Sequence, residues 1–289
     1  MRHSDKVISR VKISVLILRL NLLLSSKHWR RLCAFALILL AFLHVPRTGW
    51  AEENYFQIIN GTRDAVSDDF IRDSGYSVFV SYDDQKFLFD VGEKKKSFLG
   101  NLKAAGITLD EVDFVMLSHR HSDHTRGWSF LRKAQPSLPI YVPPGAGFSH
   151  IAEPKEVDGH LKITPNIFII HTHDEMGSLE VTDELSLLIK TKKGPYLFTT
   201  NSHTDFITKL EKAKSILGEG VFFHSGHTAR RVTPDSEILA TAKKMKNLNV
   251  KQISPSHSSP NHDKIFERVF GAGYVPAILG KKVPLEPVP

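Results

Sequence analysis

The sequence predicts an α/β protein with two β-sheets and helices on their outer faces. Beyond Ala51, short runs rich in aromatic and β-branched residues alternate with amphipathic segments of helical period. The extended runs occur in both halves of the chain, and helical segments lie between them. No linker, low-complexity tract or tandem repeat interrupts residues 52–289. We therefore expect one domain whose two sheets pack together beneath outer helices.

The first half of this domain begins with three extended segments separated by polar turns. DDQ at 83–85 lies between the second and third and predicts a hairpin loop. Apolar residues at helical spacing and a terminal glycine then predict a helix, and Pro136 closes another. The predicted strands are 54–61, 76–82, 86–92, 113–118 and 138–143, and the predicted helices are 94–106 and 125–135.

The second half repeats this style. Its extended segments are apolar and several end on a histidine, while its helices are amphipathic. The predicted strands are 161–173, 178–194, 196–203, 221–227 and 251–257, and the predicted helices are 206–218, 236–249 and 264–271.

Residues 1–51 are typical of an export signal. They hold nine Lys and Arg residues and one acidic residue, which gives this segment a net charge of +8. Because the whole chain carries +7, residues 52–289 carry a net charge of −1. This removes the main support for a nucleic-acid-binding domain. The apolar run 33–45 is shorter than the ~20 residues that span a bilayer, and Gly49 and Ala51 suit signal peptidase. We expect a cleaved signal peptide and a periplasmic or secreted protein, with an uncleaved membrane anchor as the alternative.

The chain's single cysteine, Cys33, lies in that apolar run. The mature protein therefore has no thiolate ligand or disulfide, and any metal would be held by histidines and carboxylates.

Histidines mark the ends of predicted strands. His119, His203, His227 and His257 each follow an apolar strand, and loops at one rim of a sheet are where ligands converge. In the run SHRHSDHTRGW (118–128), His119 and His121 are spaced to share one ion. Asp123 and His124 follow on a tightening turn and can reach a second ion, and a metal pair ~3.5–4 Å apart activates a shared water.

The run from FLFDVG to VDFVMLSHRHSDHTRGW resembles the metallo-β-lactamase superfamily. The order of the later motifs is similar to the 7,8-dihydropterin-6-methyl-4-(β-D-ribofuranosyl)aminobenzene-5′-phosphate synthase-like branch. The stretches that carry this similarity are 197–203, 224–227, 254–260 and 267–274. The resemblance covers residues 54–282 and implies an αββα sandwich of two mixed sheets with outer helices, with a metal site at one edge.

The resemblance also implies roles for individual residues. His119, His121 and His203 would hold the first metal, and Asp123, His124 and His257 the second. Asp90 would orient a ligand histidine, and His227 would line the pocket as a proton donor or substrate contact. Asn201 stands where the branch has cysteine, and the expected bridging aspartate is missing, since Asp205 comes two residues late.

Other residues have simpler interpretations. His171 and His173 form a second His-x-His, which we interpret as a solvated loop, and we place His224 in the same class. Arg120 and Arg126 flank the cluster, and Arg230 and Arg231 follow His227. These guanidinium groups would suit an anionic substrate, or they pair with surface carboxylates.

The sequence thus predicts a metal-dependent hydrolase that uses a metal-bound hydroxide on an ester, phosphoester, lactone or amide of a small anionic molecule. The expected metal is one or two Zn ions, with Fe or Mn as alternatives, and Asp123 or His227 handles the proton. The expected partner is a small-molecule substrate rather than nucleic acid. Only the N-terminal signal segment is expected to contact a membrane. The alternative is an exported ligand-binding or sensor protein that retains the fold without turnover, and redox use of iron ranks last.

Overall fold

Two β-sheets packed face to face organise residues 53–289 of the computed structural model. The structure describes residues 53–145, 147, 148, 151, 153–175, 181–200, 203–227, 233–256 and 260–289. The predicted signal segment, Arg230, Arg231 and His257 lie outside these ranges. Residues 52–289 form one compact unit. Within the described ranges, no helix has the length and apolarity needed to cross a bilayer.

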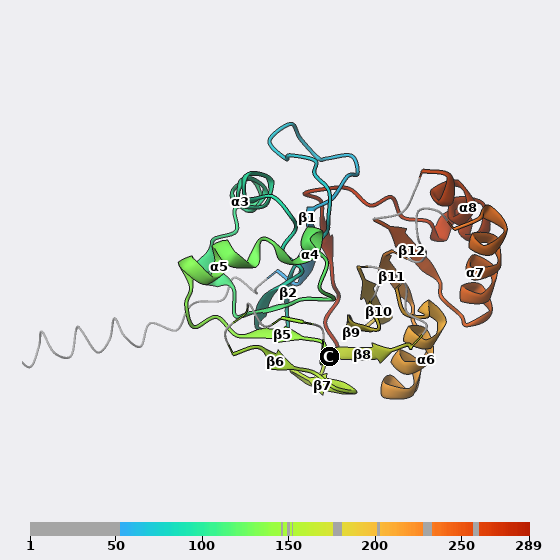
Figure 1. Ribbon diagram of the computed structural model, residues 1–289. Coiled ribbons are helices and arrows are strands. Elements are labelled where there is room, and N and C mark those ends of the chain that lie inside the picture. Colours follow the sequence, from blue (N-terminus) through green and yellow to red (C-terminus); the bar gives the residue numbers. More distant parts are fainter. Residues whose placement is uncertain are drawn as a thin grey trace, which may run out of the picture. The chain divides into compact units, whose positions relative to one another are not determined.

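The first sheet is formed by the first half of the domain and by the last strand of the chain (Figure 1). β1 pairs antiparallel with β2 and β13, whereas β3, β4, β5 and β6 pair in parallel. In spatial order its strands are β13 (Lys282–Pro284), β1 (Tyr55–Asn60), β2 (Ser77–Tyr82), β3 (Gln85–Phe89), β4 (Phe114–Met116), β5 (Ile140–Val142) and β6 (Lys155–Glu156).

The second sheet is also mixed. β10, β11 and β12 are parallel, and β7, β8, β9 and β10 are antiparallel. In spatial order its strands are β12 (Gln252–Pro255), β11 (Phe223–Gly226), β10 (Gly194–Thr199), β9 (Asp183–Thr191), β8 (Ile167–His173) and β7 (His160–Lys162).

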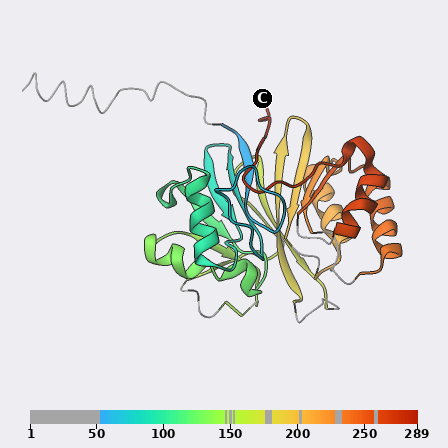
Figure 2. The same cartoon turned by 90° about the horizontal axis from the view of Figure 1, so that it is seen from above.

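Helices cover the outer face of each sheet, and Figure 2 shows the resulting four layers. α3 (Lys95–Ala104) and α5 (Trp128–Ala134) lie on the first sheet, and a short 3-10 helix, η1 (Leu109–Glu111), follows α3. The second sheet is covered by α6 (Phe206–Leu217), α7 (Asp235–Asn247) and α8 (Pro260–Phe270), with η3 (Gly271–Gly273) after α8. This confirms the predicted αββα sandwich.

Successive apolar side chains of a strand point alternately to the two faces of its sheet, and this explains the layering. Along β2, Val78 and Val80 join the core between the sheets, whereas Phe79 faces the helices. Along β9, Leu187 faces the inner core and Leu188 faces α6. Because successive side chains of a strand point to opposite faces, a strand that is apolar throughout is buried on both sides.

Element boundaries differ from the predictions at turns. The hairpin between β2 and β3 is a two-residue turn at Asp83 and Asp84, whose φ angles are 57° and 58°, the left-handed conformation that such hairpins require. The segment expected as a strand at 161–173 divides into β7 and β8. The helix expected at 125–135 begins only at Trp128, because a separate turn of helix, α4 (Ser122–Thr125), precedes it. β13 was missed.

Candidate metal centre

Those predicted site residues that the structure describes gather at the edge of the sandwich where several parallel strands end. His119 follows β4, His203 follows β10, and His227 follows β11 directly. The two sheets are joined here by a hydrogen bond from the Leu185 amide to the Ser118 carbonyl, at 2.8 Å. Side chains far apart in sequence therefore meet at this edge, as the strand-end pattern predicted.

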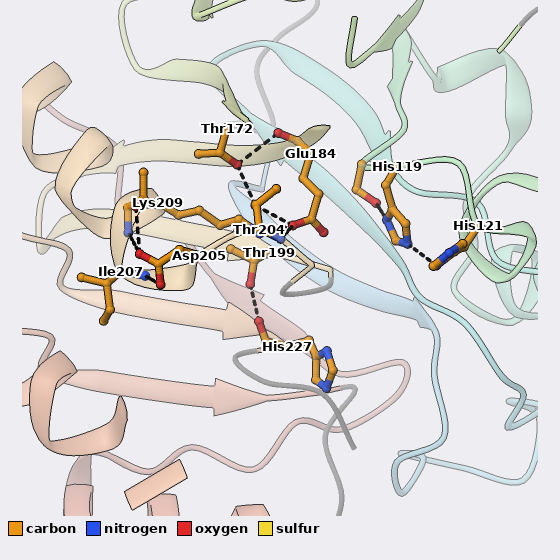
Figure 3. Close-up of polar contacts among 12 residues, drawn as sticks. His119, His121, Thr172, Glu184, Thr199, Thr204, Asp205, Ile207, Lys209 and His227 are labelled. Carbon is orange, nitrogen blue, oxygen red and sulfur yellow. Dashed lines mark hydrogen bonds and ion pairs between the residues drawn. The ribbon is translucent and has the colours of Figure 1, made fainter. Parts of the chain in front are cut away.

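His119, His121 and His203 converge on one point. One ring nitrogen from each lies within 4.8 Å of the others, which is close enough for all three to bind one ion. The centroid of the His203 ring is 4.9 Å from that of His119 and 4.7 Å from that of His121. Nε2 of His119 is 3.0 Å from Nδ1 of His121, which identifies the nitrogens that face the centre (Figure 3). Three imidazoles and no thiolate suit Zn, Fe or Mn.

The protonation state of these rings favours metal binding. Burial, and then the neighbouring histidines, lower the pKa of His119 well below its usual value. Burial also lowers the pKa of His203 to about 4, although the charge of Glu184 acts in the opposite direction. Both rings are therefore neutral near pH 7, and a neutral imidazole is the form that ligates a metal.

Asp123 and His124 lie beside the triad. Nε2 of His124 is 3.4 Å from Oδ2 of Asp123, and the His124 ring is 4.4 Å from that of His119 between centroids. Burial alone would lower the pKa of His124, but the carboxylates of Asp90 and Asp123 raise it to about 10. A proton on Nε2 thus lies between these two groups, which the sequence analysis expected to hold a second ion.

Asp90 fixes the orientation of two histidines. Its fully buried carboxylate accepts hydrogen bonds from the Ser118 amide at 2.7 Å and from the Ser118 hydroxyl at 2.8 Å. Nδ1 of His124 donates to the same carboxylate at 2.7 Å, so Nε2 of His124 faces the site. The Ser118 hydroxyl, having donated to Asp90, accepts from Nδ1 of His119 at 2.8 Å. One carboxylate therefore directs Nε2 of both rings toward the metal position.

Two glycines allow the backbone to enclose this cluster. A Cβ on Gly127 would lie 2.0 Å from the carbonyl oxygen of Val91, next to Asp90. A Cβ on Gly75, whose φ is +85°, would lie 1.9 Å from the carbonyl oxygen of Asp123. Only glycine permits such close approach, so the loop before β2 lies directly against Asp123, and the turn after α4 lies directly against the segment that follows β3.

His227 is buried at the end of β11, with 4% of its surface exposed. Its backbone is held to β10, because the Thr199 hydroxyl donates to the His227 carbonyl at 2.7 Å (Figure 3). The Cβ of an alanine at Gly226 would lie 1.6 Å from the Thr199 carbonyl oxygen, so this approach is also tight. His257, the remaining predicted ligand, lies outside the described residues.

Asp205, the nearest candidate for a bridging carboxylate, has another role. Its side chain caps α6 by accepting from the amides of Ile207 and Thr208 (Figure 3). An N-terminal cap of this kind satisfies amides that have no partner within the helix. Asp205 therefore has a structural role at the start of α6, which accounts for its place two residues beyond the position expected for the bridging carboxylate.

The interpretation of His171 and His224 as solvated loop residues was wrong. His173 is solvated, with 53% of its side chain exposed, but it lies in a strand rather than a loop. His171 and His173 belong to β8, and a ring nitrogen of each is 2.8 Å from Oδ1 of Asp183. His224 belongs to β11 and is fully buried; burial lowers its pKa to about 3. The sequence pattern missed this because a histidine in an apolar strand can be satisfied by one polar neighbour, here the Thr199 hydroxyl at 2.9 Å.

The arginines beside the cluster differ in their surroundings. Arg126 pairs with Glu93 at 3.2 Å in an exposed position, which fits the surface-pairing interpretation. Arg120 is exposed between the two histidines of the first pair. Trp128 and Phe223 are core residues.

Two charged residues near the site were missed by the sequence reasoning. Glu184 in β9 and Lys209 in α6 form an ion pair of 2.6 Å whose side chains are each 1% exposed. A signal was present, because Lys209 occupies the buried face of α6 that Phe206, Leu210 and Ala213 also form. A lysine at an apolar helical position needs a buried partner.

Comparisons with known proteins show what the chain is similar to in sequence and fold. The model of the beta-lactamase superfamily domain matches residues 86–189. The 7,8-dihydropterin-6-methyl-4-(beta-D-ribofuranosyl)-aminobenzene-5′-phosphate synthase of Methanocaldococcus jannaschii is 24% identical over 220 residues, covering 60% of this chain and 75% of that protein.

Solved structures share the fold. Tm1679, described as a metal-dependent hydrolase of the beta-lactamase superfamily, superposes with a TM-score of 0.68 at 19% identity, covering 81% of this chain and 99% of that one. A diphosphatase from the PhnP family superposes with a TM-score of 0.55 at 18% identity, covering 80% and 98%. Together with the family model matched over residues 86–189, these likenesses show that the chain has the metallo-β-lactamase fold.

Proposed function

We propose that this protein is a metal-dependent hydrolase of a small anionic ester, phosphoester, lactone or amide. The observation that carries the proposal is the convergence of three buried or half-buried imidazoles, from His119, His121 and His203, on one point. Asp123 and His124 offer a further carboxylate and imidazole beside it. This donor set fits zinc, and also iron or manganese.

A metal bound there would act as a Lewis acid and lower the pKa of a bound water, which supplies a nucleophile near neutral pH. The chain's own residues do the remaining work. Asp90, directly and through Ser118, keeps Nε2 of His119 and His124 aimed at the centre. The Asp123 carboxylate is 31% exposed and lies beside His124, so it is suited to accept a proton. His227 is proposed as the second proton-transfer or substrate-contacting group at this edge.

A phosphoester is the first substrate class to examine. One relative is named as the synthase of a 5′-phosphate and one structural neighbour as a diphosphatase. The exposed guanidinium of Arg120, within the histidine run, would contribute positive charge beside the metal position.

The test is metal content followed by a substrate screen. After expression and dialysis, the full chain is expected to retain zinc, iron or manganese, as measured by inductively coupled plasma mass spectrometry. It is then expected to hydrolyse one of bis(p-nitrophenyl) phosphate, p-nitrophenyl esters, lactones or a β-lactam. His119→Ala with His121→Ala should abolish both metal retention and turnover. The proposal would be excluded if the wild-type protein retained no metal and the double variant were as stable as the wild type.

A second function is a ligand-binding or sensor protein that keeps the metal without turnover. This second function is supported by the role of Asp205 as a helix cap, because Asp205 then does not serve as a carboxylate that bridges two metals. Metal retention and ligand binding, combined with no hydrolysis across the screen, would favour this second function.

We further propose that residues 1–51 direct export and are removed. N-terminal sequencing of protein recovered from the periplasm or medium should then begin at Glu52. A chain that stays in the membrane with Met1 intact would instead support the uncleaved anchor.

A further inference from the structure

The buried Glu184–Lys209 ion pair touches the segment that carries His203. Oε2 of Glu184 accepts from the Lys209 ammonium at 2.6 Å. It also accepts from the amide of Thr204 at 2.8 Å and from the Thr204 hydroxyl at 2.7 Å. The amide of Thr204 belongs to the peptide bond that begins at the His203 carbonyl. The carboxylate therefore holds the main chain directly at a proposed metal ligand (Figure 3).

The surrounding contacts extend this hold in both directions. The Thr204 hydroxyl also contacts the Thr172 hydroxyl of β8 at 3.1 Å, which links the segment to the sheet. The next residue, Asp205, caps α6. Thr204 is thereby fixed to β8 and β9, while its neighbour is fixed to the helix. His203 follows β10 after a short connection, so these contacts set where its backbone can lie.

A buried ion pair is a costly way to stabilise a fold. Removing two charges from water carries a penalty that their attraction often fails to repay, and apolar pairs of similar volume can be equally stable. Glu184 adds a further cost, because among the described residues its Oε1 is buried without a hydrogen-bond partner. A role beyond stability would account for such a pair beside a metal centre.

We propose that Glu184 and Lys209 are positioning residues for His203. The carboxylate clamps the Thr204 peptide and hydroxyl, and the ammonium holds that carboxylate in place. Metal affinity then depends on the pair through the geometry of the third ligand. This inference rests on the proposed metal-binding function.

The test compares apolar and polar replacements of the pair in the full chain. Glu184→Leu with Lys209→Met removes the clamp without leaving an unpaired buried charge. Glu184→Gln with Lys209→Met also removes both charges but keeps an oxygen that can accept from Thr204. Lys212→Met is the matched control, because this lysine lies on the same helix and donates instead to the His171 carbonyl, at 2.6 Å.

The readouts are zinc affinity, by competition with a chromophoric chelator after metal removal, and the absorption spectrum of the cobalt-substituted protein. We expect the Leu–Met variant to bind zinc about 10–100-fold more weakly, as for other groups that orient ligands. The Gln–Met variant should recover most of this loss, and Lys212→Met should bind as wild type. A structural role alone would alter thermal unfolding of the metal-free protein but leave the affinity and the cobalt spectrum unchanged.

Thr204→Val provides a second measurement if the Leu–Met chain fails to fold. It removes one donor to Glu184 and should weaken zinc binding about fivefold. Wild-type affinity in Thr204→Val or in the Leu–Met variant overturns the inference, as does a Gln–Met variant no better than Leu–Met. Absence of zinc binding by the wild type would instead refute the proposed function, so the two failures are distinguishable.

Discussion

Replacement of Asp90 by asparagine should weaken metal binding and destabilise the metal-free protein. Asparagine has nearly the same shape, so the packing around this fully buried side chain is retained. Its carbonyl oxygen can still accept from the Ser118 amide, but an NH2 group would replace the oxygen that now accepts from Ser118 Oγ and His124 Nδ1. The change therefore acts on hydrogen bonding and charge.

The raised pKa of His124 sets the size of the effect on stability. This pKa is about 10 in the folded chain, against the usual histidine value of 6.5. Each unit of difference corresponds to ~1.4 kcal/mol, so the protonated ring contributes up to about 4 kcal/mol at pH 7. Asp90 shares this effect with Asp123, and we expect Asp90→Asn to cost about 2–3 kcal/mol.

The sign of the pH dependence follows from a raised folded-state pKa. The stabilisation of the folded state by protonated His124 is complete below pH 6.5 and disappears as the pH rises toward 10. The gap in unfolding free energy between the metal-free wild type and Asp90→Asn should therefore narrow between these values. Urea unfolding of both proteins at several pH values measures the gap directly.

Metal affinity should fall about 10–100-fold in the same variant. An amide facing Nδ1 of His124 favours the tautomer with the proton on Nε2, the nitrogen that faces the site. Asp73→Asn is the matched control, since Asp73 is also buried but binds Lys94 and Ser97. This control should lose stability and keep its zinc affinity. Wild-type zinc affinity in Asp90→Asn, or a stability gap that does not change with pH, would refute the reasoning.

Three further predictions concern acid, backbone space and metal removal. Because the pKa of buried His224 is lowered to about 3, the folded state loses up to ~1.4 kcal/mol per pH unit as the pH falls from 6.5 toward 3. His224→Gln should flatten that part of a stability–pH curve, and an unchanged slope would contradict the assignment. Gly75→Ala places a Cβ against the Asp123 carbonyl and should lower both the melting temperature and metal affinity, whereas Gly106→Ala, where a Cβ meets no atom within 4 Å, should leave metal affinity unchanged. Removal of metal by a chelator should lower the unfolding free energy by about 2.7 kcal/mol relative to protein in zinc at 100 times its Kd, and restoring zinc should reverse this; identical calorimetric traces would argue against a bound metal.

Much of the fold could be predicted because strands buried on both faces have an unmistakable composition. The apolar runs at β2, β3, β8 and β10 and the amphipathic helices α6 and α7 all appear near their predicted positions. β13 was missed because a three-residue edge strand near a proline-rich terminus has no periodicity to detect. The division at α4 was missed; in the structure the Gly127 amide that follows α4 donates to the Gly92 carbonyl, which is distant in sequence.

The candidate site was predictable in its residue types and only partly in its surroundings. His119 and His121 are only two residues apart in sequence, and the strand-end position of His203 brought it to the same edge. The sequence alone indicated which imidazoles are candidates for a metal centre, since the pattern of strand ends predicts the edge at which they meet. Tertiary structure decided which residues control those imidazoles. Asp90 binds His124 across 34 residues, and Glu184 meets Lys209 across 25. Hydrogen bonds and ion pairs of this kind depend on distances of a fraction of an ångström between packed elements, and no local pattern in the sequence encodes them.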